Sequence, residues 1–210
     1  MPARIIAPEL DETPEKGELP RAHALRLAVA KAEAVVRVLS YPPLEGGSNR
    51  EAIRGGEVDA NVPSPKFRGK LEISTLPQGE GRALVLAADT VVALGRRILP
   101  KAESPAEVER CLRLLSGRRH QVITAIAVAV PNARLRTRVV MTRVAFKQLT
   151  AQEIAAYVAC GEGEGKAGGY AIQGRAEMFV RFINGSYSNV VGLPLYETMG
   201  LLEGRVSSEQ

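Results

Sequence analysis

The chain has 210 residues, 45% of them hydrophobic, which is enough for one domain with a core and argues against extended disorder. Trp is absent and aromatic residues make up only 4%, so a surface that stacks nucleic-acid bases is not expected. The net charge of +5 suits a polyanionic ligand such as a nucleoside triphosphate, but is too weak and scattered for a nucleic-acid-binding stripe.

Cysteine content and hydropathy bear on the compartment. Cys111 and Cys160 lie in helix-like segments without metal-ligand spacing, so we expect reduced thiols and a cytoplasmic protein. No apolar run approaches the roughly 20 residues of a membrane helix, and the first residues lack the features of a secretory signal. We therefore expect no membrane partner.

The N-terminal part predicts a short strand over 3–7, an acidic loop between Pro8 and Pro14, and a helix over about 20–39. The apolar face predicted for this helix consists of Leu25, Ala28, Val29, Ala32, Val36 and Leu39. Residues 41–82 are rich in Pro, Gly, Ser and charge without sustained periodicity. They predict a flexible insertion with little core of its own.

Order resumes with the apolar run 83–88 and its continuation T-V-V-A-L, followed by a turn at Gly95 and a returning strand. Ser104-Pro105-Ala106-Glu107 has the residues of a capping box and predicts a helix that ends at Gly117. Residues 121–130 and 134–146 form a predicted hairpin. Thr150-Ala151-Gln152-Glu153 opens another helix, and 177–184 predicts a strand.

Strands that alternate with helices, interrupted by a hairpin, predict a single α/β domain over 1–205 with a mixed, twisted sheet flanked by helices. Asp89 follows an apolar strand-like run in this pattern. A carboxylate at the exposed end of a buried strand can hold a divalent cation or act as a general base. The alternative at this stage is an aspartate that caps the next turn.

Other polar residues are less specific. Lys31 and Lys101 can each neutralise a phosphate or simply be surface lysines, and Glu12 reads as a loop acid. The turn with Arg118 and His120 would suit an anion, although a lone His at a turn is more often structural.

The glycine-rich segment 161–170 matches neither the dinucleotide fingerprint nor the Walker pattern, since Lys166 is followed by Ala167. It predicts a loop that brings Gln173, whose amide can read the edge of a base, against a ligand.

Five ordered motifs resemble the Maf family of nucleoside triphosphate pyrophosphatases. They are A-A-D-T-V-V, I-L-P-K, L-R-L-L-S-G-R-R-H-Q-V-I-T, K-A-G-G-Y-A-I-Q-G and I-N-G-S-Y-S-N-V-V-G-L-P-L. The resemblance implies a Maf/inosine-triphosphatase-like fold with a cleft between two lobes. It also implies metal-assisted attack of water on the α-phosphorus, which yields a monophosphate and pyrophosphate.

The resemblance also implies site residues. Asp89 matches the catalytic carboxylate, while Glu12, Lys31 and Lys101 match the other cleft positions that bind substrate and phosphate. Asp89 and Glu12 would hold Mg²⁺ or Mn²⁺. The form K-A-G-G-Y-A-I-Q-G resembles the subgroup that acts on dTTP and UTP, with modified pyrimidine nucleotides as further substrates, and Thr90 and Gln173 match its specificity positions.

One family feature is missing from this sequence. The resemblance implies an opening loop of the type A-S-x-S-P-R-R, but this chain begins Met1-Pro2-Ala3-Arg4 and contains no S-P-R-R. We therefore expect either an upstream start or a truncated, weakened enzyme. The alternative function is a nucleotide-binding or cell-division regulatory protein without turnover. A homodimer is compatible with the sequence, and no nucleic-acid partner is expected.

Overall fold

The computed structural model describes residues 3–6, 8–40, 71–75, 83–130 and 133–204. A twisted seven-stranded sheet forms its centre, in the order β1-β2-β3-β6-β7-β9 with β4 paired to β3, and β5 pairs with β8 in a separate ribbon. The strands are β1 (Ala3–Ile6), β2 (Leu71–Thr75), β3 (Ala83–Leu94), β4 (Arg97–Leu99), β5 (Lys101–Ala102), β6 (Arg119–Ala129), β7 (Arg136–Phe146), β8 (Lys166–Ala167) and β9 (Val180–Asn184).

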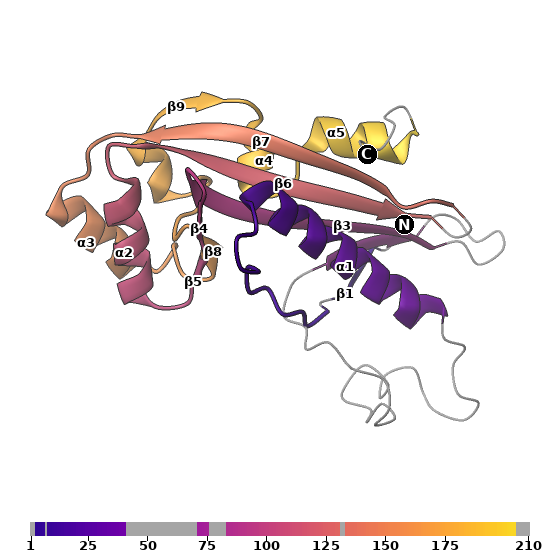
Figure 1. Cartoon of the computed structure of the whole chain (residues 1–210). Coiled ribbons are helices and arrows are strands. Elements are labelled where there is room, and N and C mark those ends of the chain that lie inside the picture. Colours follow the sequence, from indigo (N-terminus) through magenta and orange to yellow (C-terminus); the bar gives the residue numbers. More distant parts are fainter. Residues whose placement is uncertain (1–2, 7, 41–70, 76–82, 131–132, 205–210) are drawn as a thin grey trace, which may run out of the picture.

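The predicted α/β fold with a sheet flanked by helices is confirmed (Figure 1). Strands in both directions were expected, whereas every pairing among the described residues is antiparallel. The long central strands are joined by the predicted β6–β7 hairpin, which needs no parallel crossover. The helices are α1 (Pro20–Ser40), α2 (Pro105–Leu115), α3 (Ala151–Cys160), α4 (Tyr187–Val191) and α5 (Leu195–Leu202), with a 3₁₀ helix over Arg175–Phe179.

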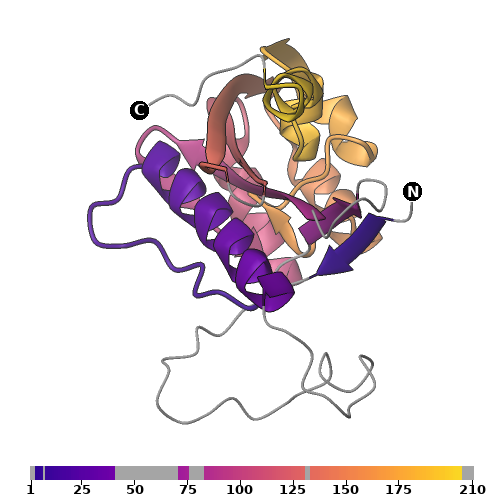
Figure 2. The ribbon, with the colours of Figure 1, turned by 90° about the vertical axis from the view of Figure 1, so that its right-hand side faces the viewer.

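Helices cover both faces of the central strands, which explains why β6 is buried along most of its length. Alternate residues of a strand point to opposite faces. Ile123, Ala125 and Ala127 pack with α1, whereas Ile126 and Val128 pack with Leu201 of α5. Figure 2 shows α1 and the yellow C-terminal helices on opposite sides of the sheet.

The sheet with α1 and α5 forms one lobe of the molecule. A second lobe, the α2–α3 lobe, is built around α2 and α3, which pack against each other at one end of the sheet (Figure 1). Its core is formed by apolar and aromatic side chains, among them Leu112, Phe146, Tyr157 and Phe179. Both helices begin at the predicted caps, where the hydroxyls of Ser104 and Thr150 accept amide hydrogen bonds. In α2, however, the Glu107 carboxylate accepts from the Glu103 amide instead of the cap residue.

The predicted apolar face of α1 is wrong for several positions. Val36 and Leu25 are only partly buried and Leu39 is exposed. The buried face consists of His23, Ala24, Leu27, Ala28, Lys31, Ala32 and Val35. Alanines on this face are small and let α1 approach the sheet closely. The prediction was wrong because the buried face contains these small residues and a lysine instead of a continuous row of large apolar side chains.

Two other predictions need correction. The segment 177–184 was predicted as one strand, but its first part continues the 3₁₀ helix and only Val180–Asn184 is extended. Within the predicted insertion 41–82, residues Leu71–Thr75 form β2 and pair with both β1 and β3. The remainder of that insertion lies outside the described residues.

His120 is part of the core of the α2–α3 lobe, and its structural role is confirmed. Its side chain is 2% exposed, its Nε2 lies 2.8 Å from the Tyr170 hydroxyl, and its ring packs edge-on against Phe146. Nδ1 has no hydrogen-bond partner among the described groups. Burial lowers the pKa of His120 from 6.5 to about 4, because a charged imidazolium would lose its hydration there.

This shift predicts a loss of stability in acid. Between pH 6.5 and 4 the unfolded chain binds a proton at His120 that the folded chain does not, so the free energy of unfolding falls by about 1.4 kcal/mol per pH unit as the pH drops. Urea denaturation at pH 7.0, 6.0 and 5.0 measures this slope. The variant His120→Phe should show a slope smaller by roughly that amount; equal slopes would contradict a buried neutral imidazole.

Candidate functional site

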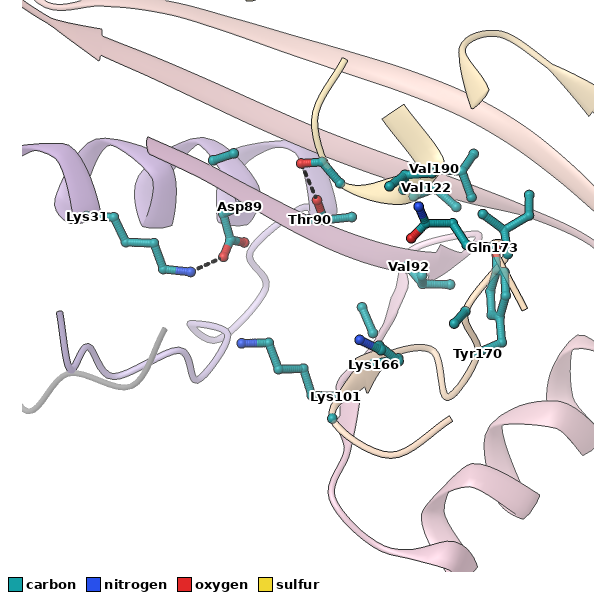
Figure 3. Close-up of a pocket in the computed structure, with 17 residues that line it drawn as sticks. Lys31, Asp89, Thr90, Val92, Lys101, Val122, Lys166, Tyr170, Gln173 and Val190 are labelled. Carbon is teal, nitrogen blue, oxygen red and sulfur yellow. Dashed lines mark hydrogen bonds and ion pairs between the residues drawn. The ribbon is translucent and has the colours of Figure 1, made fainter. Parts of the chain in front are cut away.

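A cavity of about 240 Å³ lies between α1, β3, the β5–β8 ribbon and α4. It therefore separates the α1 side of the molecule from the α2–α3 lobe, as the predicted cleft between two lobes requires. Figure 3 shows lysine, carboxylate, hydroxyl and amide groups around it. The polar side chains that line it are Lys31, Asp89, Thr90, Lys101, Lys166 and Gln173.

The pairing of β3 explains why the cavity forms here. Asp89 was predicted at the end of a strand, but it lies in the middle of the twelve-residue β3. On the edge away from β6, β2 pairs with β3 at 83–85 and β4 pairs at 92–94. Among the described strands, residues 86–91 have no partner on that edge, so neighbouring residues on opposite faces, Asp89 and Thr90, both line the same opening.

Asp89 and Lys31 form a buried ion pair at the floor of this opening (Figure 3). Each side chain is only 5% exposed. Lys31 comes from the buried face of α1, and Asp89 projects from the face of β3 that α1 covers. Burial alone would lower the pKa of Lys31, but the negative charges of Asp89 and Glu12 outweigh burial and raise it. Lys31 is therefore held as a cation in the core.

Glu12 connects this pair to a second lysine. Its Oε1 lies 2.9 Å from Lys31 Nζ and its Oε2 lies 2.7 Å from Lys101 Nζ. Burial acts to raise the pKa of Glu12, but the hydrogen bond from Lys101 and the ion pair with Lys31 outweigh burial and lower it. Four residues predicted as a site, distant in sequence, thus form one alternating chain of charges: Asp89, Lys31, Glu12 and Lys101.

The β5–β8 ribbon contributes the opposite wall. Lys101 pairs with Ala167, and Lys166 with Ala102, so both lysines lie at the rim. Gly168 has φ +68, and a Cβ there would come within 2.8 Å of the Val92 side chain. A glycine is therefore needed for the ribbon to approach β3. Lys166 was not predicted as a site residue, and its position in a glycine-rich segment was the only indication.

Thr90 and Gln173, predicted together as specificity positions, both line the cavity on the side away from Lys31 (Figure 3). Thr90 contacts the wall formed by α4, where its Oγ1 lies 3.4 Å from the Gly192 carbonyl oxygen. The anion site suggested for Arg118 and His120 is not supported, because the His120 ring is buried behind Tyr170 and does not line this cavity.

The donor set fits a hard divalent cation only in part. Glu12 and Asp89 offer carboxylate oxygens around one shared ammonium group, and Mg²⁺ is commonly bound by one or two carboxylates together with substrate phosphates and water. The described residues contain no group of three or more potential His, Cys, Asp or Glu ligands. The site therefore fits a metal whose coordination is completed by the ligand, rather than a metal held by the protein alone.

The cavity is lined by three lysines and the Asp89 carboxylate, and Glu12 bridges two of these lysines beside it. This arrangement suits a phosphorylated or otherwise polyanionic ligand. Residues 1–205 match the family model described as "Maf-like protein", and the chain belongs to that family.

Curated relatives are similar over most of their length. A dTTP/UTP pyrophosphatase of Sphingopyxis alaskensis is 50% identical over 202 residues, which cover 96% of this chain and 84% of the relative. Proteins of the same name from Rhodopseudomonas palustris strain HaA2 and Nitrobacter hamburgensis are 48% and 46% identical over 203 residues, covering 97% of this chain and 81% of each relative.

Cys111 and Cys160 are both free thiols, as expected. In the part of the chain that the structure describes, no helix is long and apolar enough to cross a membrane.

The buried ion pair predicts a large stability effect at Lys31. Lys31→Met leaves the Asp89 carboxylate buried without its partner, so the free energy of unfolding should fall by about 3 kcal/mol or more. Lys101→Met is the matched control: its side chain is 38% exposed, and its loss should cost less than about 1 kcal/mol. Chemical denaturation of both variants measures this difference. Equal decreases in the free energy of unfolding would show that the buried Lys31–Asp89 pair stabilises the fold no more than the exposed Lys101 does.

Proposed function

We propose that this chain hydrolyses dTTP and UTP to the monophosphate and pyrophosphate. The observation that carries the proposal is the charge chain in which two lysines and two carboxylates alternate beside the cavity. Relatives with close to half of their residues identical are named dTTP/UTP pyrophosphatase. A triphosphate needs several cations near its phosphates and a carboxylate near the attacking water, and this cavity has both.

The ion pairs suggest how substrate prepares the site. Without a ligand, the Asp89 carboxylate is engaged by the ammonium group of Lys31. Triphosphate oxygens would compete for the ammonium groups of Lys31 and Lys101. Partial transfer of Lys31 to phosphate leaves Asp89 free to accept a hydrogen bond from water. Substrate binding and activation of the base are then coupled through one lysine.

The reaction proposed at Asp89 is an in-line displacement. The water oxygen forms a bond to the α-phosphorus while the bridging bond from that phosphorus to the β-phosphate oxygen breaks, and pyrophosphate leaves. Asp89 orients the water and accepts its proton. Lys31 and Lys101 offset negative charge on the phosphates, with Lys166 at the rim as a third cation.

A divalent cation fits this proposal, with Glu12 and Asp89 as the residues that would hold Mg²⁺ or Mn²⁺. When bound, such an ion would neutralise phosphate charge and polarise the phosphoryl group. Thr90 and Gln173, on the far side of the cavity, are the residues proposed to contact the base. A cytoplasmic location and a homodimer stay predictions, the second of which light scattering on the purified chain would check.

The role of Asp89 predicts a severe loss of turnover in Asp89→Asn. The amide cannot accept the proton of water, so kcat for pyrophosphate release from UTP or dTTP with Mg²⁺ should fall roughly 10²–10⁴-fold. Glu109→Gln, on the exposed surface of α2, is a matched carboxylate control and should retain wild-type turnover. If wild type releases no pyrophosphate from any triphosphate, the proposed function is wrong and a nucleotide-binding regulatory role replaces it.

The metal assignment predicts weaker cation binding in two variants. Mn²⁺ titrations followed by electron paramagnetic resonance, with a non-hydrolysable α,β-imido UTP present, report bound metal without turnover. Asp89→Asn and Glu12→Gln should each weaken Mn²⁺ binding by at least about tenfold, because each removes a charged oxygen ligand. Unchanged Mn²⁺ affinity in both variants would exclude these residues as ligands.

A further inference from the structure

We propose that a buried chain of hydroxyl and amide groups, through Thr142, Asn189 and Thr124, presents Thr90 to the cavity as a hydrogen-bond acceptor. The site would then prefer pyrimidine nucleotides that offer a hydrogen-bond donor to Thr90. This inference rests on the proposed function, since it concerns selectivity at the same cavity. Thr124, Asn189 and Thr142 act on the ligand only through Thr90 and the α4 wall, and are therefore positioning residues.

The far end of the chain is fixed by Thr142 of β7. Thr142, Asn189 and Thr124 are all fully buried. The Thr142 hydroxyl donates to the Ser186 carbonyl oxygen at 3.1 Å and accepts from the Ser186 amide at 3.0 Å. It also accepts from Asn189 Nδ2 at 3.0 Å. Its single proton and its acceptor capacity are thus used by the protein.

Close packing keeps this end in place. Gly185 has φ +127, and a Cβ there would lie 2.7 Å from Thr142 Oγ1. The chain therefore approaches the Thr142 hydroxyl at a position where any side chain would intrude. Asn189 Nδ2 also donates to the Val122 carbonyl oxygen at 3.1 Å. Its two protons are therefore both used, one by Thr142 and one by Val122. These contacts tie α4, which carries Val190 and Val191 of the cavity wall, to β6 and β7.

The near end of the chain determines the proton of Thr90. Thr124 Oγ1 donates to the Asn189 carbonyl oxygen at 3.0 Å and lies 2.9 Å from Thr90 Oγ1. A hydroxyl has one proton. If Thr124 donates to Asn189, then Thr90 donates to Thr124. If Thr124 instead donates to Thr90, the Thr90 proton is directed to the Gly192 carbonyl oxygen at 3.4 Å.

The first arrangement uses the two shorter contacts, 3.0 Å from Thr124 to the Asn189 carbonyl oxygen and 2.9 Å between the two hydroxyls, and in it the only proton of Thr90 is used inside the protein. What Thr90 can offer to a ligand in the cavity is a lone pair, which accepts but does not donate. Uracil and thymine carry an imide N3–H, whereas cytosine has a bare N3 acceptor at the same place. A sugar hydroxyl is the other nucleotide donor. The shared chemistry is a ligand N–H or O–H directed at Thr90.

The wild-type test uses ligands that lack one donor at a time. Binding of α,β-imido analogues of UTP, CTP, 3-deaza-UTP and 3′-deoxy-UTP is measured by calorimetry, so the result does not require turnover. We expect CTP and 3-deaza-UTP to bind at least about tenfold more weakly than UTP if the base provides the donor, or 3′-deoxy-UTP to do so if the sugar does. Equal affinities for all four analogues would overturn the inference.

The positioning role is tested at Thr124. Thr124→Val keeps the shape of the side chain but removes the group that fixes the Thr90 proton, so the preference for UTP over CTP should shrink by about tenfold. Thr124→Ser should restore it. Where substrate is turned over, the change should appear in KM with kcat within about twofold. Thr150→Val, at the distant cap of α3, is the matched control and should keep wild-type selectivity.

The outcomes separate the two proposals. A wild type that binds UTP selectively but releases no pyrophosphate would overturn the proposed function alone. A wild type that releases pyrophosphate from UTP, but in which Thr124→Val folds normally and keeps full selectivity, would overturn the positioning role alone. The analogue series on wild type does not depend on the folding of any variant.

Discussion

The buried pairing of Lys31 with Asp89 is the interaction on which the arrangement of the site depends. A charge in a protein interior is tolerated only with a partner, so a carboxylate in the middle of β3 requires a cation from the element that covers it. Helix α1 supplies that cation from its buried face. The pair therefore fixes the rotation of α1 on the sheet and places the cavity beside it.

The open edge of β3 is the second constraint. Pairing with β2 at one end and β4 at the other leaves the middle of the strand uncovered among the described residues. Side chains from both faces of the sheet can then reach one cavity. The face toward α1 supplies charged groups through Asp89, and the opposite face supplies a neutral hydroxyl through Thr90. This division suits a ligand with a charged end and an uncharged end, such as a nucleotide.

Without a ligand, the groups of the charge chain are neutralised by ion pairs with one another. The Thr90 hydroxyl is instead held by hydrogen bonds within the protein. Asp89, Lys31, Glu12 and Lys101 alternate in sign, so a phosphate that binds to Lys31 or Lys101 would have to compete with the carboxylate partners of these lysines. Thr90, in contrast, is held by hydrogen bonds that reach through β6 to α4. On the Asp89 side, ligand binding would therefore require ion pairs to change partners, whereas on the Thr90 side the hydrogen bonds would stay in place.

The sequence by itself determined the α/β class and the capped helices, because periodicity and caps are local. The residues of the charge chain were predicted together only through the resemblance to a known family, since each of them alone could equally be a surface or capping residue. It did not determine the register of α1, since Lys31 interrupts an apolar stripe made of small alanines. Nor did it determine that Asp89 lies within β3 and not at its end, because the open edge depends on which strands pair on either side. The Thr142–Asn189–Thr124 chain joins three separate segments through single hydrogen bonds, and only the tertiary structure brings them together.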